Sequence, residues 1–283
     1  MIRRIFVPLT GGGGDPAALA VAFAAAARLG AHVDAALLRF DQRYTRPKLS
    51  EPLPPGLFEE IASLLGDHDA EEDAAEGRFE EARNAAAAPL CDEAPGPGGL
   101  SARWLGVRPA ERIVRDGRLS DLIVLGPTLS HDSQRPNVIR RAALATAGRP
   151  LLLASKPSRA NIGSRVAIAW NGSASAAQAV SAAMPLLAKA AAVHVLTVPT
   201  ERTRSSEGER LVDYLKWHGI AAEARVLENR EPVGSMLLAM AGALDADLLV
   251  MGGYIHSRLQ DLLLGGVTAH VFAHATLPIF IAR

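Results

Sequence analysis

The stretch of the chain with the clearest chemical potential is Met251–Thr268, which reads MGGYIHSRLQDLLLGGVT. It begins at the carboxyl end of an apolar run, and ligands of open α/β sheets bind beyond the carboxyl ends of strands. It ends at Gly265 and Gly266, where a helix is expected to begin, and the backbone N–H groups at a helix start suit an anion such as phosphate. His256 and Arg258 could add hydrogen-bond donors. Spacing alone leaves a second interpretation open, an ordinary strand–loop–helix connection.

The elements that would position this stretch occur twice in the chain. Three apolar runs recur in the same order: 4–9 and 165–170, 121–126 and 247–252, and 149–154 and 277–282. In the second pair, DLIVLG and DLLVMG are identical at four of six positions. The chain is therefore a repeat of two halves, of which the first carries a long insertion over 41–100.

Each half alternates apolar runs of strand length with Ala- and Leu-rich stretches of helical length. Runs that are apolar throughout indicate strands buried on both faces of a parallel sheet, and strict alternation implies βαβ units. We therefore predict an α/β chain of two doubly wound domains, joined by a polar linker at 154–164. Strands are expected near 4–9, 32–38, 101–106, 121–126 and 150–154, then 165–170, 192–198, 221–227, 247–251 and 278–282. Helices are expected near 16–29, 57–88, 108–117 and 137–147, then 173–189, 206–218, 231–243 and 258–273, with Asp15 and Ser173 as N-caps.

Several motifs of the second half resemble the universal stress protein family, and the whole chain resembles its tandem, two-domain form. VAIAWNGSASAAQAV, DADLLVMGGY followed by HSRL, LLLGGVT and the closing LPIFIA carry the likeness. The first half resembles the family more loosely, through RIFVPL, LSDLIVLGP and GRPLLLASK. The resemblance implies a universal stress protein domain at 163–283 and a degenerate one at 1–156. It also implies five-stranded parallel sheets flanked by helices (adenine nucleotide alpha hydrolase-like), packed as an internal pseudo-dimer whose last strands, 150–154 and 278–282, meet.

The family includes ATP-binding members, which are expected to carry the signature G-x2-G-x9-G-(S/T) after the fourth strand. In this sequence the first glycine of the signature falls on Gly252 and the third on Gly265. The second falls on Ile255 and the Ser/Thr position on Gly266, so two positions depart. Ile255 is the more serious departure, because a β-branched residue disfavours the positive φ and the close backbone approach that glycine allows.

The position after the first strand departs from the family as well. ATP-binding members place an aspartate there, near the adenosine, and this chain has Asn171, which can hydrogen-bond a ribose or a base but carries no charge. Trp170, just before it, either fills the pocket or stacks on a ring. The candidate nucleotide-binding residues are Asn171, Met251, Gly252, His256, Ser257, Gly265, Gly266 and Val267.

The first half shows no comparable signature. No glycine follows Gly126 before the expected helix at 137–147. The run Gly11–Gly14 follows a strand and opens a helix, but no Gly-Lys-Ser/Thr comes after it, so it is not a Walker loop. We expect this run to be a flexible turn.

The resemblance implies a stress-response binding or regulatory protein rather than an enzyme, and no catalytic residue is assigned. Its ligand would be ATP or another adenine nucleotide, with Mg²⁺ only if a nucleotide binds. One alternative is an interaction protein whose pocket is collapsed by Ile255 and Trp170. A lower-ranked alternative is a slow Mg-dependent nucleotide hydrolase, for which the sequence offers no clear general base. An open or a filled cleft between 169–172 and 252–267 would distinguish ligand binding from the collapsed pocket.

Composition narrows the range of partners. The 283 residues include 30 basic and 30 acidic side chains, so the net charge is 0. Binding to a nucleic-acid backbone relies on a surplus of basic residues, so the composition gives no electrostatic argument that the chain binds nucleic acid. The single cysteine, Cys91, excludes an internal disulfide and any multi-Cys metal site, and we expect no metal site. No run reaches the ~18 apolar residues of a membrane span. We therefore expect a cytoplasmic protein that binds neither nucleic acid nor membrane, and that can form a homodimer or bind a protein partner as yet unknown.

Overall fold

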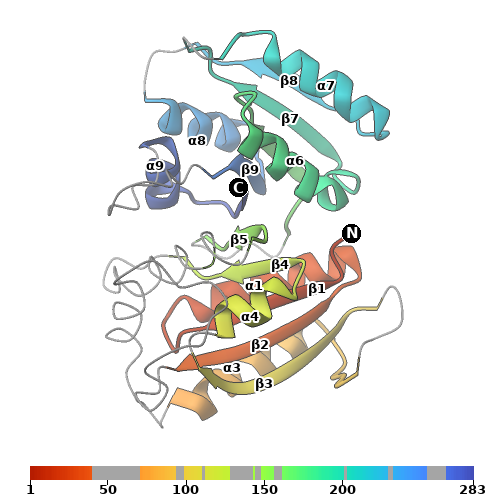
Figure 1. The fold of residues 1–283 in the computed structure, drawn as a ribbon, viewed down its shortest axis with the longest axis vertical. Coiled ribbons are helices and arrows are strands. Elements are labelled where there is room, and N and C mark those ends of the chain that lie inside the picture. Colours follow the sequence, from red (N-terminus) through yellow and green to blue (C-terminus); the bar gives the residue numbers. More distant parts are fainter. Residues whose placement is uncertain are drawn as a thin grey trace. The chain divides into compact units, whose positions relative to one another are not determined.

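The computed structural model of the chain describes residues 1–39, 71–93, 99–109, 112–127, 143, 148–155, 161–200, 203–228, 232–253 and 266–283. The chain divides into two compact units, Met1–Ala154 and Ser155–Arg283. Within each unit the strands pair in parallel and helices pack against the sheet (Figure 1). The predicted fold class, two doubly wound α/β layers, is confirmed.

The first unit has its strands in the order β3-β2-β1-β4-β5. They are β1 (Arg4–Leu9), β2 (His32–Arg39), β3 (Ser101–Pro109), β4 (Leu122–Leu125) and β5 (Leu151–Leu153). The described helices of this unit are α1 (Asp15–Leu29), α3 (Glu71–Ala85) and α4 (Arg112–Arg118). The strand order changes direction between β1 and β4, so the switch point of this sheet lies where these two strands end.

The second unit repeats the plan in the order β10-β9-β6-β7-β8. Its strands are β6 (Arg165–Ala169), β7 (Ala192–Thr197), β8 (Glu223–Val226), β9 (Leu248–Gly252) and β10 (Ile279–Ala282). Its described helices are α6 (Ala174–Leu187), α7 (Glu207–Trp217), α8 (Val233–Ala243) and α9 (Gly266–His274). The corresponding switch point lies between β6 and β9.

Several strands are buried along their whole length and form part of the core of each unit. All residues of β4, β5 and β10 are buried, as expected of strands that are apolar throughout. The strand β8 differs, because three of its four residues are exposed. Its mixed sequence, EARV, is that of a strand at the edge of a sheet.

The first residue of the DLIVLG and DLLVMG repeats has the same structural task in both units. The carboxylate of Asp121 accepts hydrogen bonds from two backbone N–H groups at the start of β1, at 2.8 and 3.0 Å. The carboxylate of Asp247 accepts the corresponding two bonds at the start of β6, at 3.0 and 3.1 Å. Each aspartate precedes the fourth strand of its unit and fastens it to the beginning of the first strand.

The last glycine of these repeats lies against the first helix of its unit. A Cβ atom on Gly126 would lie 2.6 Å from the carbonyl oxygen of Gly14. A Cβ atom on Gly252 would lie 2.5 Å from the backbone nitrogen of Ala176 and 2.7 Å from the carbonyl carbon of Ser175. Only glycine permits so close an approach, so both positions are constrained by packing at the switch point.

Two predicted boundaries are wrong. The helix expected from residue 108 begins at Arg112 in α4, because β3 continues to Pro109. Gly106, at φ +71°, and a register shift in β2 let this longer strand keep pairing. Asp15 is the first residue of α1 rather than its N-cap, which is Gly14. The expected cap at Ser173 is confirmed, because its Oγ accepts a hydrogen bond from the backbone N–H of Ala176 at 3.2 Å.

Several expectations fall outside the described residues. They are the helix at 57–70, the helix at 137–147 apart from Ala143, the start of the last helix at 258–265, the linker at 156–160 and much of the insertion at 41–100. Within the described part of the chain, no helix combines the length and the apolar character that crossing a membrane requires.

The contact at Gly126 predicts that Gly126→Ala destabilises the first unit. The added methyl group would meet backbone atoms of Gly14, which cannot rotate away, and overpacking of this kind costs about 1–3 kcal/mol. Urea unfolding followed by circular dichroism measures the change in the free energy of unfolding. Gly77→Ala is the control within α3, where a Cβ meets nothing within 4 Å and a gain of up to about 1 kcal/mol is expected. Equal effects of the two variants would contradict the packing argument.

Candidate functional site

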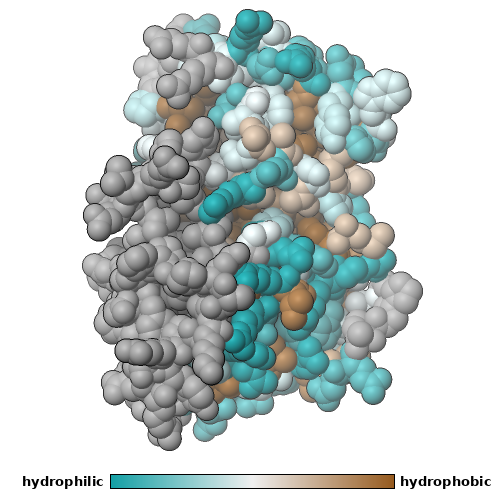
Figure 2. Space-filling model, in the orientation of Figure 1, coloured by the Kyte–Doolittle hydropathy of each residue, from teal (hydrophilic) through white to brown (hydrophobic). Residues whose placement is uncertain are grey.

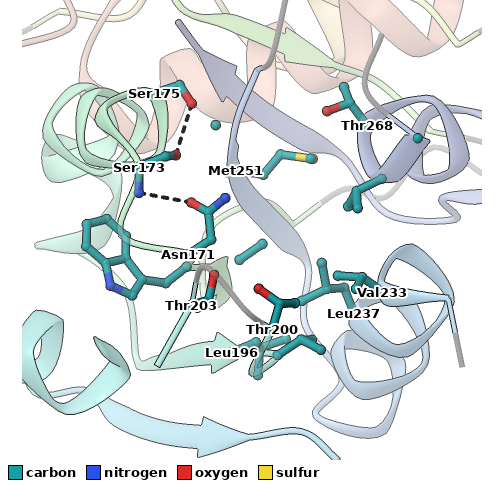
Figure 3. Close-up of a pocket in the computed structure, with 16 residues that line it drawn as sticks. Asn171, Ser173, Ser175, Leu196, Thr200, Thr203, Val233, Leu237, Met251 and Thr268 are labelled. Atoms are coloured by element: carbon teal, nitrogen blue, oxygen red, sulfur yellow. Dashed lines mark hydrogen bonds between the residues drawn. The ribbon is translucent and has the colours of Figure 1, made fainter. Parts of the chain in front are cut away.

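A cavity of about 380 Å³ lies at the carboxyl ends of β6, β7 and β9 (Figure 3). β6 and β9 are the neighbours at which the strand order reverses, so the cavity occupies the position where doubly wound sheets bind ligands. Its volume falls within the range of roughly 300–1,000 Å³ that is usual for small-molecule pockets. The residues that line it are Ala169, Trp170, Asn171, Ser173, Ser175, Leu196, Val198, Thr200, Thr203, Val233, Leu237, Met251, Gly252, Gly266, Val267 and Thr268.

None of these lining residues carries a charged side chain. Hydroxyl groups come from Ser173, Ser175, Thr200, Thr203 and Thr268, and the one side-chain amide is that of Asn171. The apolar surface comes mainly from Leu196, Val198, Val233, Leu237 and Met251. In the parts of the chain that are described, no three His, Cys, Asp or Glu side chains gather as a metal site would require. The described lining suits a ligand group that is uncharged, has flat apolar faces and carries several hydrogen-bonding atoms.

The turn between β6 and α6 forms one wall. The Oδ1 atom of Asn171 accepts a hydrogen bond from the backbone N–H of Ser173 at 3.1 Å, and the two serine Oγ atoms of Ser173 and Ser175 lie 3.2 Å apart (Figure 3). Since Oδ1 is engaged within the turn, the amide nitrogen of Asn171 is the group that points away from Ser173. Asn171 therefore offers a ligand a donor rather than an acceptor.

The end of β9 forms the opposite wall. Met251 is buried in β9, and its side chain reaches the cavity (Figure 3). Gly252 follows it and lies against the first turn of α6. The glycine predicted as a point of close approach for phosphate is therefore already required by the contact with Ser175 and Ala176.

The chain after β7 and the helix α8 close the cavity from the side. Thr200 and Thr203 exchange two backbone hydrogen bonds, of 3.0 and 3.2 Å, which fold this segment into a small antiparallel bridge. Val233 and Leu237 lie one turn apart on α8 and face the cavity together with Leu196 (Figure 3).

The described beginning of α9 completes the lining, with Gly266, Val267 and Thr268 at the cavity. The Thr268 side chain is buried at the cavity. Thr268 comes two positions after Gly266, the residue at the Ser/Thr position of the signature.

Trp170 lines the cavity without filling it. Its indole Nε1 is buried and has no hydrogen-bond partner among the described residues. The same side chain also lines a second groove, of about 600 Å³, together with residues of α6 and α7. A buried N–H group without a partner is uncommon in proteins.

The structure brings together five of the eight predicted site residues. Asn171, Met251, Gly252, Gly266 and Val267 all line the cavity. His256, Ser257 and Gly265, together with Ile255, lie outside the described residues. The prediction missed the residues after β7 and those of α8. The rule that ligands bind at strand ends, applied to the second strand of the repeat, would have pointed to Leu196 and Val198.

The matching position of the first unit is occupied by a carboxylate of the chain itself. The two turns after the first strands correspond, since Gly11 and Gly172, which are 161 residues apart, have φ values of +77° and +72°. In the first unit Asp15 turns back into this turn and accepts hydrogen bonds from the backbone N–H groups of Thr10, at 3.1 Å, and Gly11, at 2.9 Å. At the same spacing the second unit has Ala176, whose methyl group accepts no hydrogen bond. The polar side chains of this part of the wall are therefore those of serines.

Asp15 is buried beside Arg78. Arg78 of α3 lies 3.8 Å from the carboxylate and donates a hydrogen bond to the carbonyl oxygen of Gly11. Burial raises the pKa of Asp15 to about 6, although the hydrogen bonds from Thr10 and Gly11 and the charge of Arg78 act to lower it. The carboxylate therefore titrates within the mildly acidic range.

Residues 164–283 match the sequence profile of the universal stress protein family. A universal stress protein from Archaeoglobus fulgidus is 13% identical over 99% of this chain and 96% of its own, with a TM-score of 0.68. A putative universal stress protein from Pseudomonas aeruginosa is 17% identical over 99% of this chain and 93% of its own, with a TM-score of 0.58. At such identities the likeness shows the fold alone. None of the curated proteins compared with the chain matches it.

The raised pKa of Asp15 predicts a pH dependence of stability. The folded state holds the proton more tightly than the unfolded chain, whose carboxyl pKa is near 3.8, so stability contributed by Asp15 falls as pH rises from about 4 to 6. We expect the free energy of unfolding of the native chain to lose about 1–3 kcal/mol relative to Asp15→Asn between pH 4.5 and pH 7.5. Urea unfolding of both proteins at the two pH values measures this difference. A difference that does not change with pH would contradict the raised pKa.

Proposed function

We propose that the cavity at the ends of β6 and β9 binds an adenine nucleotide or nucleoside, because residues 164–283 match the universal stress protein family. The observation that carries the proposal is the open cavity at the switch point of the sheet, with hydroxyl, amide and backbone donors around an apolar interior. We further propose that the protein acts by binding this ligand in a regulatory role in the stress response.

The distribution of groups around the cavity fits the parts of an adenosine-containing ligand. Apolar side chains of β7 and α8, such as Leu196 and Leu237, would pack on the faces of the base. The amide nitrogen of Asn171 would donate to a ribose oxygen or a ring nitrogen. Phosphate groups, where the ligand has them, would lie toward the N–H groups at the start of α9.

The proposal is favoured over an interaction protein with a collapsed pocket. That alternative requires Ile255 and Trp170 to fill the cleft. About 380 Å³ stays open beside Trp170, and Ile255 lies outside the described residues.

Binding without turnover is favoured over nucleotide hydrolysis. General acid–base catalysis needs a titratable side chain within hydrogen-bond reach of the reacting atoms, and the described lining holds hydroxyls, one amide and apolar groups. We therefore propose that Mg²⁺ enters only as a companion of bound phosphates.

Filling the cavity should abolish binding. Val233→Trp places a large ring at the start of α8, where this residue lines the cavity. We expect the dissociation constant for adenosine or ATP to rise about tenfold or more, which is a loss of about 1.4 kcal/mol or more of binding free energy. Isothermal titration calorimetry with adenosine, AMP and ATP, each with and without Mg²⁺, measures the affinities. Thermal unfolding shows whether the variant keeps its fold.

Leu119→Trp is the matched control. Leu119 is an exposed residue of the first unit, so the same ring is added away from the cavity, and binding should stay as in the native chain. Absence of heat with every one of these ligands at millimolar concentration would refute the proposal. Equal binding by the native chain and Val233→Trp would place the ligand elsewhere.

A further inference from the structure

Among the described strands, β8 forms one edge of the second unit's sheet. It is last in the order β10-β9-β6-β7-β8, and β7 is the one described strand beside it (Figure 1). The side chains of Glu223 and Arg225 are 64% and 51% exposed, and Val226 is 51% exposed. Hydrophilic side chains gather over the end of the unit that carries α7 and β8 (Figure 2). An exposed edge of this kind can pair with another strand.

The backbone directions of β8 can be derived from its pairing with β7. The N–H group of Leu227 donates to the carbonyl oxygen of Thr197 at 2.8 Å, so the backbone groups of Leu227 point toward β7. Backbone groups of successive residues in a strand point to alternate sides, so those of Arg225 and Glu223 also point toward β7. The N–H and C=O groups of Ala224 and Val226 therefore point outward, to the free edge.

The charges of β8 are complementary to those of an antiparallel copy of the same strand. Glu223 and Arg225 lie on one face of the strand, two residues apart, and form an ion pair of 2.8 Å. If two copies of β8 pair about a two-fold axis at Ala224, Glu223 of each copy lies opposite Arg225 of the other. Ala224 then forms the hydrogen-bonded pair at the centre, and the charged residues take the non-hydrogen-bonded positions, where opposite side chains lie closest.

The other face of β8 agrees with the same arrangement. Ala224 faces α7, since its Cβ lies near the position that a Cβ on Gly208 would take. Ala222 and Val226 share that face by alternation, and the two-fold axis at Ala224 places Ala222 opposite Val226 of the second copy. The exposed side chain of Val226 would thereby be covered by Ala222 of the second copy. Glu223 and Arg225 lie on the opposite face, so no charged side chain would be buried against Val226.

We propose that β8 pairs edge to edge with the β8 of a second copy of this chain, antiparallel and centred on Ala224. The four-residue strand makes a small interface, so the dimer is weak and depends on concentration. Its charges form a row in which Glu223 and Arg225 alternate across the two strands. This surface lies on β8 and not at the cavity, so the proposal does not depend on nucleotide binding.

Sedimentation velocity of the full chain at protein concentrations from about 10 μM to 1 mM tests the proposal. This hundredfold range of concentration corresponds to about 2.7 kcal/mol in the association free energy. We expect the native chain to shift from monomer to dimer over this range. Glu223→Arg alone, or Arg225→Glu alone, sets like charges opposite each other twice, and we expect the dissociation constant to rise tenfold or more. The double variant, Glu223→Arg with Arg225→Glu, is self-complementary again, and we expect it to recover the dimer.

Ala224→Pro tests the backbone pairing separately. Its N–H group points to the free edge, so proline there removes a bond to the second copy but none to β7, a position that an edge strand tolerates. We expect a folded monomer, with circular dichroism and thermal unfolding close to those of the native chain. A native chain that stays monomeric at 1 mM would overturn the proposal. So would dimers that persist unchanged in both single charge variants and in Ala224→Pro.

Discussion

The candidate site depends on a contact that leaves no room for a side chain. At each switch point the fourth strand ends in a glycine whose backbone lies against the first turn of the first helix, at Gly126 in one unit and Gly252 in the other. In the second unit this contact holds the end of β9 beside the turn of Asn171 and thereby sets the distance between two walls of the cavity. Glycine at 252 is thus explained by packing alone, so its presence in a nucleotide signature says little by itself about nucleotide binding.

The two units share this plan and differ in what occupies the turn after the first strand. In the first unit the carboxylate of Asp15 accepts hydrogen bonds from backbone N–H groups of the turn, and burial raises its pKa. In the second unit, where Ala176 stands, Ser173 and Ser175 line an open cavity. The two turns thus differ in a carboxylate, Asp15, at the position where the second unit has the methyl group of Ala176.

The fold could be predicted from the sequence because buried parallel strands are apolar throughout, and the repeated DLIVLG and DLLVMG runs mark the fourth strand of each unit. The extension of β3 could not, because it depends on the bulge near Gly106. In the site, the resemblance to the family pointed to Asn171, and the rule that ligands bind at strand ends pointed to the stretch that contains Gly252. The roles of Thr200 and Thr203 arise only when the segment after β7 folds back on itself, and hydrophobic pattern carries no signal of that bridge.

The most direct test of the central claim, that the cavity is a ligand site, uses the indole N–H of Trp170. The chain has three tryptophans, so a ¹H–¹⁵N spectrum should contain three indole signals, of which Trp170→Phe identifies one. Titration with adenosine should move the Trp170 signal in a saturable way, because Trp170 lines the cavity, while the signals of Trp104 and Trp217 should not move. A Trp170 signal that stays in place at millimolar adenosine and millimolar ATP would contradict the claim.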